Sequence, residues 1–282
     1  QNKLKDLVKN YCLSGDTHTT TIKKITPAGT AKVYDLYEKE TDTWITEGVV
    51  NRGCGEIPLP PFGTCLLGSV NLVKYVHINN KLFDWDRLIE DIPCIVRALD
   101  NVIDHTIYPL KEYEVEQKNK RRMGIGVTGL ANAGEALGFP YATEKFLEFT
   151  KRVMKTLRNE CYLASIELAK EKGSFPLFNK EKYLESKFIK RLPKQIQDGI
   201  AEHGIRNSHL LSVAPTGTIS LSADNISSGI EPVFAWEYDR TIITENGPVI
   251  EPVLDYGVNF LGVKGRTSDT ISAMEHLNVL TT

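Results

Sequence analysis

The sequence predicts an α/β fold, and three observations support that prediction. Long segments with helical periodicity, at 83–106 and 143–173, alternate with short apolar runs at 209–214 and 232–238. The short runs have the length of strands and lie between turn signals. Helices that alternate with buried strands are typical of an α/β layer or barrel. The first fifty or so residues are instead rich in Thr, Val, Ile, Tyr and Trp, and predict a small β-rich segment.

The composition excludes several classes of protein. The chain has 282 residues, of which 25% are charged, and its formal net charge is −2. No basic stripe is visible, so neither nucleic acid nor an anionic membrane is expected as a partner. The densest basic run, at 118–122, is typical of a solvated turn. No apolar run approaches the roughly 20 residues of a membrane span, and five cysteines, an odd number, favour a reducing, cytoplasmic location.

The segment 83–106 predicts an amphipathic helix. Its apolar residues recur at intervals of three and four, so they line one face. Asp84 is expected to cap the helix, and Pro93 to kink it because proline lacks a backbone donor. Cys94 lies next to the apolar face, which favours a packed thiol.

The segment 143–173 predicts a second long helix. Thr143 is placed to cap it and Gly173 to end it in a left-handed conformation. Cys161 falls among apolar neighbours and is expected to be structural. A third, more polar helix is expected over about 190–203.

Two glycine-containing motifs could bind phosphate. GIGVTG, at 124–129, fits the spacing of a dinucleotide-binding loop but follows KNKRRM, which is no buried strand, so the signal is weak. APTGTIS, at 214–220, follows an apolar run and carries the hydroxyls of Thr216, Thr218 and Ser220. Its N–H groups could form a phosphate nest or an ordinary tight turn, and the residues alone do not decide between them.

Cys54 and Cys65 raise a question of chemistry. They are eleven residues apart with no His between them, so neither a zinc site nor any other metal site is expected. A secreted disulfide conflicts with the odd number of cysteines, and no feature supports a histidine base for a nucleophile. In an extended segment Cys54 and Glu56 point to the same side. They could therefore transfer a hydrogen and a proton on one substrate, with Cys65 supplying reducing equivalents.

The stretch CGEIPLPPFGTCLLGSVNL, at 54–72, resembles the active-site loop of ribonucleotide reductases in their adenosylcobalamin-dependent class II form. The resemblance continues in the same order through RALDNVID, RRMGIGVTGLANAGEALG, KEKGSFPLF, APTGTIS and SSGIEPVFAWEY, and covers about 54–282. It implies an oxidoreductase, the C-terminal catalytic part of such an enzyme, that reduces ribonucleoside diphosphates to deoxyribonucleotides for DNA synthesis.

The resemblance also implies a role for each matched residue. Cys54 matches the cysteine that carries a transient thiyl radical and abstracts the ribose 3′ hydrogen. Glu56 matches the carboxylate that takes the 3′-hydroxyl proton, and Cys65 one thiol of the pair that becomes a disulfide in each turnover. Gly55 is expected beside the substrate. The loop expected to bind the substrate phosphates consists of Pro215, Thr216, Gly217, Thr218 and Ile219.

The implied fold is part of the ten-stranded α/β barrel of these reductases, over 54–282, and it is expected to be incomplete. The expected partners are a ribonucleotide, an upstream barrel half in cis or in trans, and a second copy in a homodimer. The implied cofactor is adenosylcobalamin, whose contacts are not assigned, and a thioredoxin-type dithiol is the expected reductant.

The segment 1–53 resembles an intein remnant of the Hint type. CLSGDT, at 12–17, is similar to an intein opening, and 25–50 to its closing strands. The family pattern is Asn-x-Cys-x-Glu, but Arg52 stands two residues before Cys54 and Asn51, the catalytic candidate, one step earlier. Joining Tyr11 to Cys54 would restore the pattern. A degraded relic, or the tail of an insert that starts upstream, is favoured over an active intein.

Two alternatives stay open at this stage. The chain could belong to a class I large subunit, which receives its radical from a partner protein. It could also be an inactive reductase fragment left by intein insertion, since an open half-barrel would expose strand edges and apolar surface.

Overall fold

The computed structural model describes residues 43–46, 49–52, 59–245 and 247–282. The chain divides into two compact units, Gln1–Pro58 and Leu59–Thr282. In the first unit, β1 (Thr43–Thr46) and β2 (Val49–Arg52) pair antiparallel, which agrees with the expected β-rich segment. Only the backbone of Asn51 is described, in β2. Cys54, Gly55 and Glu56 lie outside the described residues.

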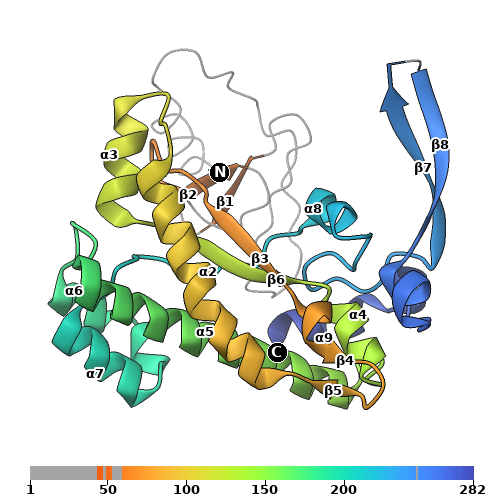
Figure 1. The fold of residues 1–282 in the computed structure, drawn as a ribbon. Helices are drawn as coiled ribbons and strands as arrows, with labels where there is room; N and C mark the ends of the chain where they lie inside the picture. Colours follow the sequence, from red (N-terminus) through yellow and green to blue (C-terminus); the bar gives the residue numbers. More distant parts are fainter. Residues whose placement is uncertain (1–42, 47–48, 53–58, 246) are drawn as a thin grey trace, which may run out of the picture. The chain divides into compact units, whose positions relative to one another are not determined.

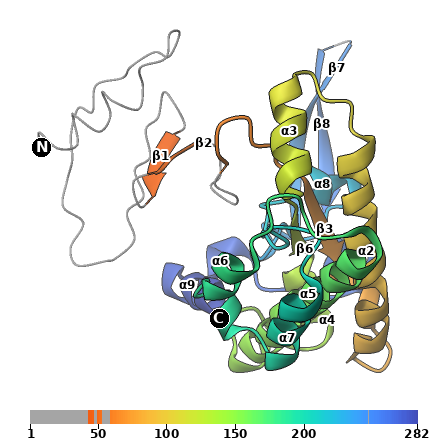
Figure 2. The same cartoon turned by 90° about the vertical axis from the view of Figure 1, so that its left-hand side faces the viewer.

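The second unit is built on two parallel strands, β3 (Leu67–Asn71) and β6 (Gly124–Thr128), which run side by side in Figure 1 and Figure 2. The segment 209–212 lies on the other side of β6, where the N–H of Ile125 donates to the carbonyl of Leu210 (2.7 Å). A parallel bridge joins Ile125 and Leu211. The strand expected at 209–214 therefore pairs in the sheet, but over a shorter length than expected.

Gly126 allows the three parallel segments to approach closely. A Cβ atom at this position would lie 2.4 Å from the carbonyl oxygen of Ser212. The first two glycines of GIGVTG are thus inside a buried strand, and Gly129 begins α4 (Leu130–Ala136) with a φ of 73°. The motif is therefore used for strand packing, which agrees with the weak dinucleotide signal.

The helices expected from periodicity are present. α2 (Trp85–His105) begins at Asp84, whose side chain accepts from the N–H of Arg87, and the helix contains Pro93. α5 (Glu144–Lys172) follows Thr143, but the Thr143 hydroxyl donates to the carbonyl of Pro140 rather than capping the helix. Gly173 ends α5 with a φ of 81°, although its ψ of 162° places it outside the left-handed helical region.

The third expected helix begins later than predicted. α7 spans Lys194–His203 because Pro193 stands at its N-cap, and a 3-10 turn, η2 (Ile189–Arg191), precedes it. The strand expected at 232–238 is also shorter than predicted. Val233 forms one bridge with Thr267, and Glu237 begins β7.

The remaining elements connect or cover this framework. Their bounds are η1 Leu72–Tyr75, β4 Val76–His77, β5 Leu82–Phe83, α3 Lys111–Lys120, α6 Lys180–Glu185, α8 Gly217–Ser222, β7 Glu237–Thr244, β8 Gly247–Leu254, η3 Gly257–Leu261, η4 Ser268–Thr270 and α9 Ala273–Thr281. The antiparallel hairpin β7–β8 stands away from the helices in Figure 1. Among the described residues, no helix is both long and apolar enough to cross a membrane.

One face of the β3–β6 pair packs on α2. A Cβ atom at Gly68 would lie 3.1 Å from Leu99 of α2, so Gly68 and its in-register partner Ile125 face that helix. Side chains alternate along a strand. The side chains of Leu67 and Ser69 therefore point to the opposite face.

The two cysteines expected to be packed differ. Cys161 is fully buried in α5, as predicted, and burial raises the pKa of its thiol. The prediction for Cys94 is wrong, since this residue is exposed. It lies two positions from both Ile92 and Val96, which are buried, and two positions on a helix turn a side chain by about 200°.

A buried ionic network joins α2 to the residues just before β6. Asp100 has no exposed surface and accepts from Nε of Arg121 (2.8 Å), Nε of Arg206 (3.2 Å) and Nδ2 of Asn207 (2.9 Å). Burial raises the pKa of Asp100, but hydrogen bonds and charge from Arg121, with help from Asn207 and Arg206, outweigh burial and lower it overall. Arg121 also binds Asp104 (2.7 Å).

This network corrects the interpretation of 118–122. A solvated turn was expected, but Arg121 and Arg122 are each 4% exposed. The carboxylates of Asp100 and Asp104 replace water around Arg121, and they come from a helix that precedes it in the chain.

We expect Asp100→Ala to lower the free energy of unfolding by about 3–5 kcal/mol, because it leaves buried cations without their partner. Urea denaturation of the chain measures this. Glu90→Ala, at an exposed position of the same helix, is the matched control and should change stability by about 0.5 kcal/mol or less. Equal effects of the two substitutions would contradict a structural role for the network.

Candidate active site

Cys65 lies just before β3, and its side chain is exposed. The ladder continues to this point, because the N–H of Gly124 donates to the carbonyl of Leu66 (2.8 Å). Continuing the alternation of β3 by one pair of residues puts Cys65 on the face of Leu67 and Ser69, away from α2. Cys65 therefore lies at the amino end of the face opposite α2.

The predicted phosphate loop directly follows the third parallel segment and forms the start of α8. Thr216 is buried, whereas Pro215, Gly217, Thr218 and Ile219 are exposed. The N–H of Ser220 donates to the carbonyl of Thr216 (2.8 Å), which closes the first turn. The N–H groups of the first helical residues have no acceptor inside a helix, so in this turn they are available to a ligand.

Thr216 adopts a strained backbone conformation. Its φ of 53° and ψ of 20° lie in the left-handed region, which β-branched residues rarely enter. Such strain costs on the order of 1–3 kcal/mol and is concentrated at functional sites. The Thr216 hydroxyl offsets it, since it hydrogen bonds to Oγ1 of Thr128 (3.0 Å) and accepts from the N–H of Gly229 (2.6 Å).

A buried polar cluster fixes the segment that Thr216 contacts. The N–H of Ser227 donates to Oδ1 of Asn132 (2.6 Å), and Nδ2 of Asn132 donates to Oδ1 of Asp255 (3.0 Å). Asp255 also accepts from the N–H of Gly257 (2.8 Å). Burial raises the pKa of Asp255, although the hydrogen bonds from Asn132 and Gly257 oppose that shift. The cluster thus holds 227–229 against α4 and, through Gly229, against Thr216.

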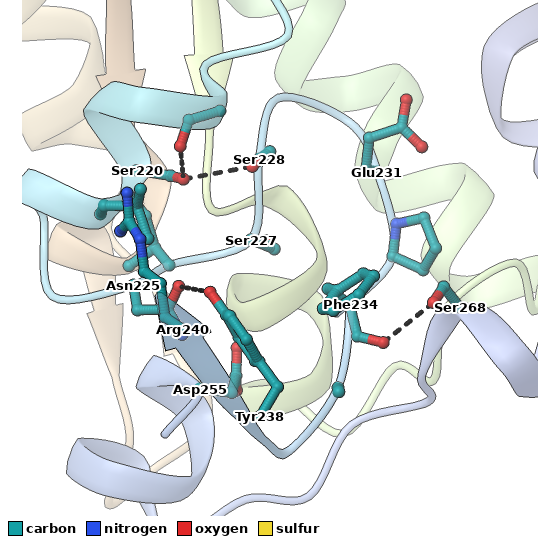
Figure 3. A pocket seen from close by; sticks show the side chains of 15 residues that line it. Ser220, Asn225, Ser227, Ser228, Glu231, Phe234, Tyr238, Arg240, Asp255 and Ser268 are labelled. Atoms are coloured by element: carbon teal, nitrogen blue, oxygen red, sulfur yellow. Dashed lines mark hydrogen bonds between the residues drawn. The ribbon is translucent and has the colours of Figure 1, made fainter. Parts of the chain in front are cut away.

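A cavity of about 450 Å³ adjoins α8, which supplies Gly217 and Ser220 to its wall. Figure 3 shows Phe234, Tyr238 and Arg240 gathered around it, with Ser220 hydrogen-bonded to Ser228. This volume lies within the range of small-molecule sites, about 300–1,000 Å³. The cavity is therefore large enough for part of a nucleotide beside the loop.

The structure brings only some of the predicted site residues together. Thr216 to Ile219 form one turn, and Thr216 is tied to Thr128 at the carboxyl end of β6. Cys65 lies at the amino end of the same strand pair, so the described residues do not place it next to the loop.

Sequence reasoning missed the residues that hold the loop. Thr128, Asn132, Gly229 and Asp255 were not singled out, although Thr128 and Asn132 lie in the quoted stretch RRMGIGVTGLANAGEALG and Gly229 in SSGIEPVFAWEY. The hydroxyl of Thr128, at the end of a glycine-rich segment, was a signal that could have identified this residue as part of the site. No local signal exists for Asp255, which is 123 residues from its partner Asn132.

Comparison with known proteins decides the family. Residues 37–278 match the family described as ribonucleotide reductase, barrel domain. The chain belongs to the ribonucleotide reductase barrel-domain family. The expected fold, an α/β structure that is part of the reductase barrel, is thereby confirmed.

Individual relatives agree with this assignment. The chain is 39% identical over 202 residues to a vitamin B12-dependent ribonucleoside-diphosphate reductase of Mycobacterium tuberculosis, covering 72% of this chain and 26% of the relative. It is 36% identical to the protein of the same name in Thermoplasma acidophilum, over 74% and 25% of the two chains. A ribonucleoside-diphosphate reductase subunit alpha of Chlamydia pneumoniae is 32% identical, over 60% and 18%. The chain spans about a quarter of the length of the first two relatives.

The described part of this reductase-family chain shows no group of three or more His, Cys, Asp or Glu residues that could hold a metal ion.

We expect Thr216→Ala to lower the free energy of unfolding by about 1–3 kcal/mol, because the N–H of Gly229 and the Thr128 hydroxyl lose a buried partner. Thr216→Ser keeps the hydroxyl and should retain most of the stability. Thr218→Ala, on the exposed side of the same turn, is the control. If thermal or urea unfolding shows no difference between the Ala variants, the hydroxyl does not anchor the loop.

The raised pKa of Asp255 gives a pH dependence with a definite sign. Between its ordinary value of 3.8 and the raised folded value, the folded chain binds more protons than the unfolded chain. Stability from this group therefore increases as the pH falls through that window. Compared with Asp255→Asn, the wild-type chain should gain stability from pH 7 toward pH 4 in urea titrations. A difference between the two proteins that stays constant with pH would contradict the shift.

Proposed function

We propose that this chain is part of an enzyme that reduces ribonucleoside diphosphates to deoxyribonucleotides, and that residues 215–219 bind the substrate phosphates. The observation that carries the proposal is the strained Thr216 turn, which is anchored on β6 and is followed by the exposed residues Gly217, Thr218 and Ile219 at the start of α8. Anions bind favourably where N–H groups and the helix dipole point outward. The names of the relatives supply the reaction.

The thiol chemistry that we propose balances as follows. Cys54, as a thiyl radical, takes the ribose 3′ hydrogen, and Glu56 takes the 3′-hydroxyl proton. The 2′-hydroxyl takes a proton and leaves as water, while Cys65 and a second thiol supply two electrons and two protons in total, leave a hydrogen on C2′ and become a disulfide. Glu56 returns its proton to the 3′ oxygen, and Cys54 returns the hydrogen to C3′ and is again a thiyl radical. Asn51 and Gly55 are proposed to contact the substrate. A thioredoxin-type dithiol then reduces the disulfide.

We further propose the class II form. The two vitamin B12-dependent relatives are 39% and 36% identical to the chain, compared with 32% for the subunit alpha of Chlamydia pneumoniae. Adenosylcobalamin is therefore the proposed radical source. The cavity beside α8, at about 450 Å³, is of a size for smaller ligands and does not by itself fit a corrinoid. No step is assigned through that cofactor.

The proposed partners are the ribonucleotide, an upstream barrel half in cis or in trans, and a second copy of the chain, in the cytoplasm. The domain division at residue 54 and the intein-like nature of 1–53 stay predictions. The family match begins at residue 37, inside that segment.

The test uses the chain reconstituted with the other segments of the reductase. We expect Cys54→Ser to abolish formation of deoxyribonucleotide with little change in nucleotide affinity, because a hydroxyl does not form the required radical. Cys65→Ser should allow at most one turnover with a dithiol reductant. Cys94→Ser, at another exposed cysteine, is the control and should remain active. Product formation is measured by chromatography.

Multiple turnovers by the Cys54 or Cys65 variant would contradict the assigned roles. The same assay separates the classes, because class II predicts that activity requires added adenosylcobalamin. Activity that instead requires a separate radical-generating protein would support class I. No activity under either condition would favour an inactive fragment.

A further inference from the structure

Arg122 is buried, and two of its three side-chain nitrogen atoms lack a hydrogen-bond partner among the described residues. Its side chain is 4% exposed, and among the described residues its Nε and Nη1 atoms have no hydrogen-bond partner. A buried guanidinium without partners is costly, so native structures retain one only where something else requires it. The reaction scheme above gives Arg122 no role.

The surroundings of Arg122 leave its charge only partly compensated. Oε1 of Glu116 lies 3.7 Å from Nη1, too far for a hydrogen bond, and the same oxygen accepts from Nζ of Lys120 at 2.6 Å. Gln117 contacts the carbonyl of Arg122 rather than its guanidinium (2.7 Å). Glu116 is therefore shared between two cations.

Cys65 is the group that lies beside Arg122 on the neighbouring strand. β3 and β6 pair in register from Leu67 with Gly124 onward, and extending this register by two residues sets Cys65 beside Arg122. In-register residues of adjacent strands are about 5 Å apart and point to the same face. Burial lowers the pKa of Arg122, and the charges of Glu116 and of an ionised Cys65 oppose that shift. The guanidinium and the sulfur therefore interact electrostatically.

We propose that Arg122 is a positioning residue for Cys65, and that its guanidinium favours the thiolate form of this cysteine. The effect of Arg122 on the Cys65 thiol does not depend on the proposed function, but its role in disulfide reduction does. When a dithiol reduces the disulfide, its thiolate attacks the second sulfur, the S–S bond breaks, and Cys65 leaves as a thiolate. The second thiol of the reductant then displaces the other cysteine, so two electrons and two protons pass to the pair. A stabilised thiolate leaves faster.

Other charged groups near Arg122 define the expected pH profile. α3 contributes Glu116 and Lys120, and the segment beside β6 contributes His209. Burial, together with the charges of Arg122 and Lys120, lowers the pKa of His209 and so favours the neutral form of this ring. Glu116 opposes the effect of Arg122 on Cys65, and Lys120 weakens that opposition.

The experiment measures alkylation of the full chain by iodoacetamide between pH 6 and pH 10, with each cysteine peptide quantified by mass spectrometry. Cys94, exposed on α2, serves as the internal reference. We expect Arg122→Met to slow the alkylation of Cys65 roughly tenfold at pH 7, as for a rise of about one pKa unit. Arg122→Lys should keep most of the wild-type rate. Glu116→Gln should increase the rate, because it removes the opposing charge.

A titration midpoint of Cys65 that is the same in wild type, Arg122→Met and Glu116→Gln would overturn the proposal. Glu116→Gln keeps the test valid if Arg122→Met does not fold, since it leaves the arginine in place. A purely structural role would change thermal stability but not the pH profile of Cys65 relative to Cys94. Alkylation requires no turnover. Its outcome can therefore be interpreted even if the assay for reductase activity fails.

Discussion

The candidate site depends on one hydroxyl group. Oγ1 of Thr216 hydrogen bonds to Thr128 at the end of β6 and to the N–H of Gly229, and so joins three separate segments of the chain. These bonds hold Thr216 at a positive φ, which a β-branched residue otherwise avoids. Since this residue precedes α8, its conformation decides where the first N–H groups of that helix point.

Two buried polar groups support this arrangement from either end of β6. Asp100 binds Arg121, just before β6, and Asn207, just before the segment 209–212, and Asp255 orders the segment after α8 through Asn132. Both carboxylates are buried, and burial raises the pKa of each. At Asp255 the partners are neutral amides, and the pKa is raised overall. At Asp100 the cationic partners outweigh burial, and the pKa is lowered overall. The difference shows how the charge of the donors, rather than burial alone, sets the ionisation of a buried acid.

Much of the framework could be predicted from the sequence, because periodicity and capping are local. α2 and its cap Asp84, α5 and buried Cys161 follow from residues within one segment. The exposure of Cys94 and the burial of Arg121 could not be predicted in this way, since both depend on which elements pack nearby. The turn at 215–219 was expected, but not the strain at Thr216, whose bonding partners lie 88 and 13 residues away.

The most direct test of the account is a structure of the reductase that contains this chain, determined with a ribonucleoside diphosphate bound. The account predicts phosphate oxygens at hydrogen-bond distance, about 2.7–3.2 Å, from the N–H groups at the start of α8. Thr216 should keep its positive φ and its bond to Thr128. Phosphates bound elsewhere, for example at Arg240 with the α8 turn empty, would contradict the account.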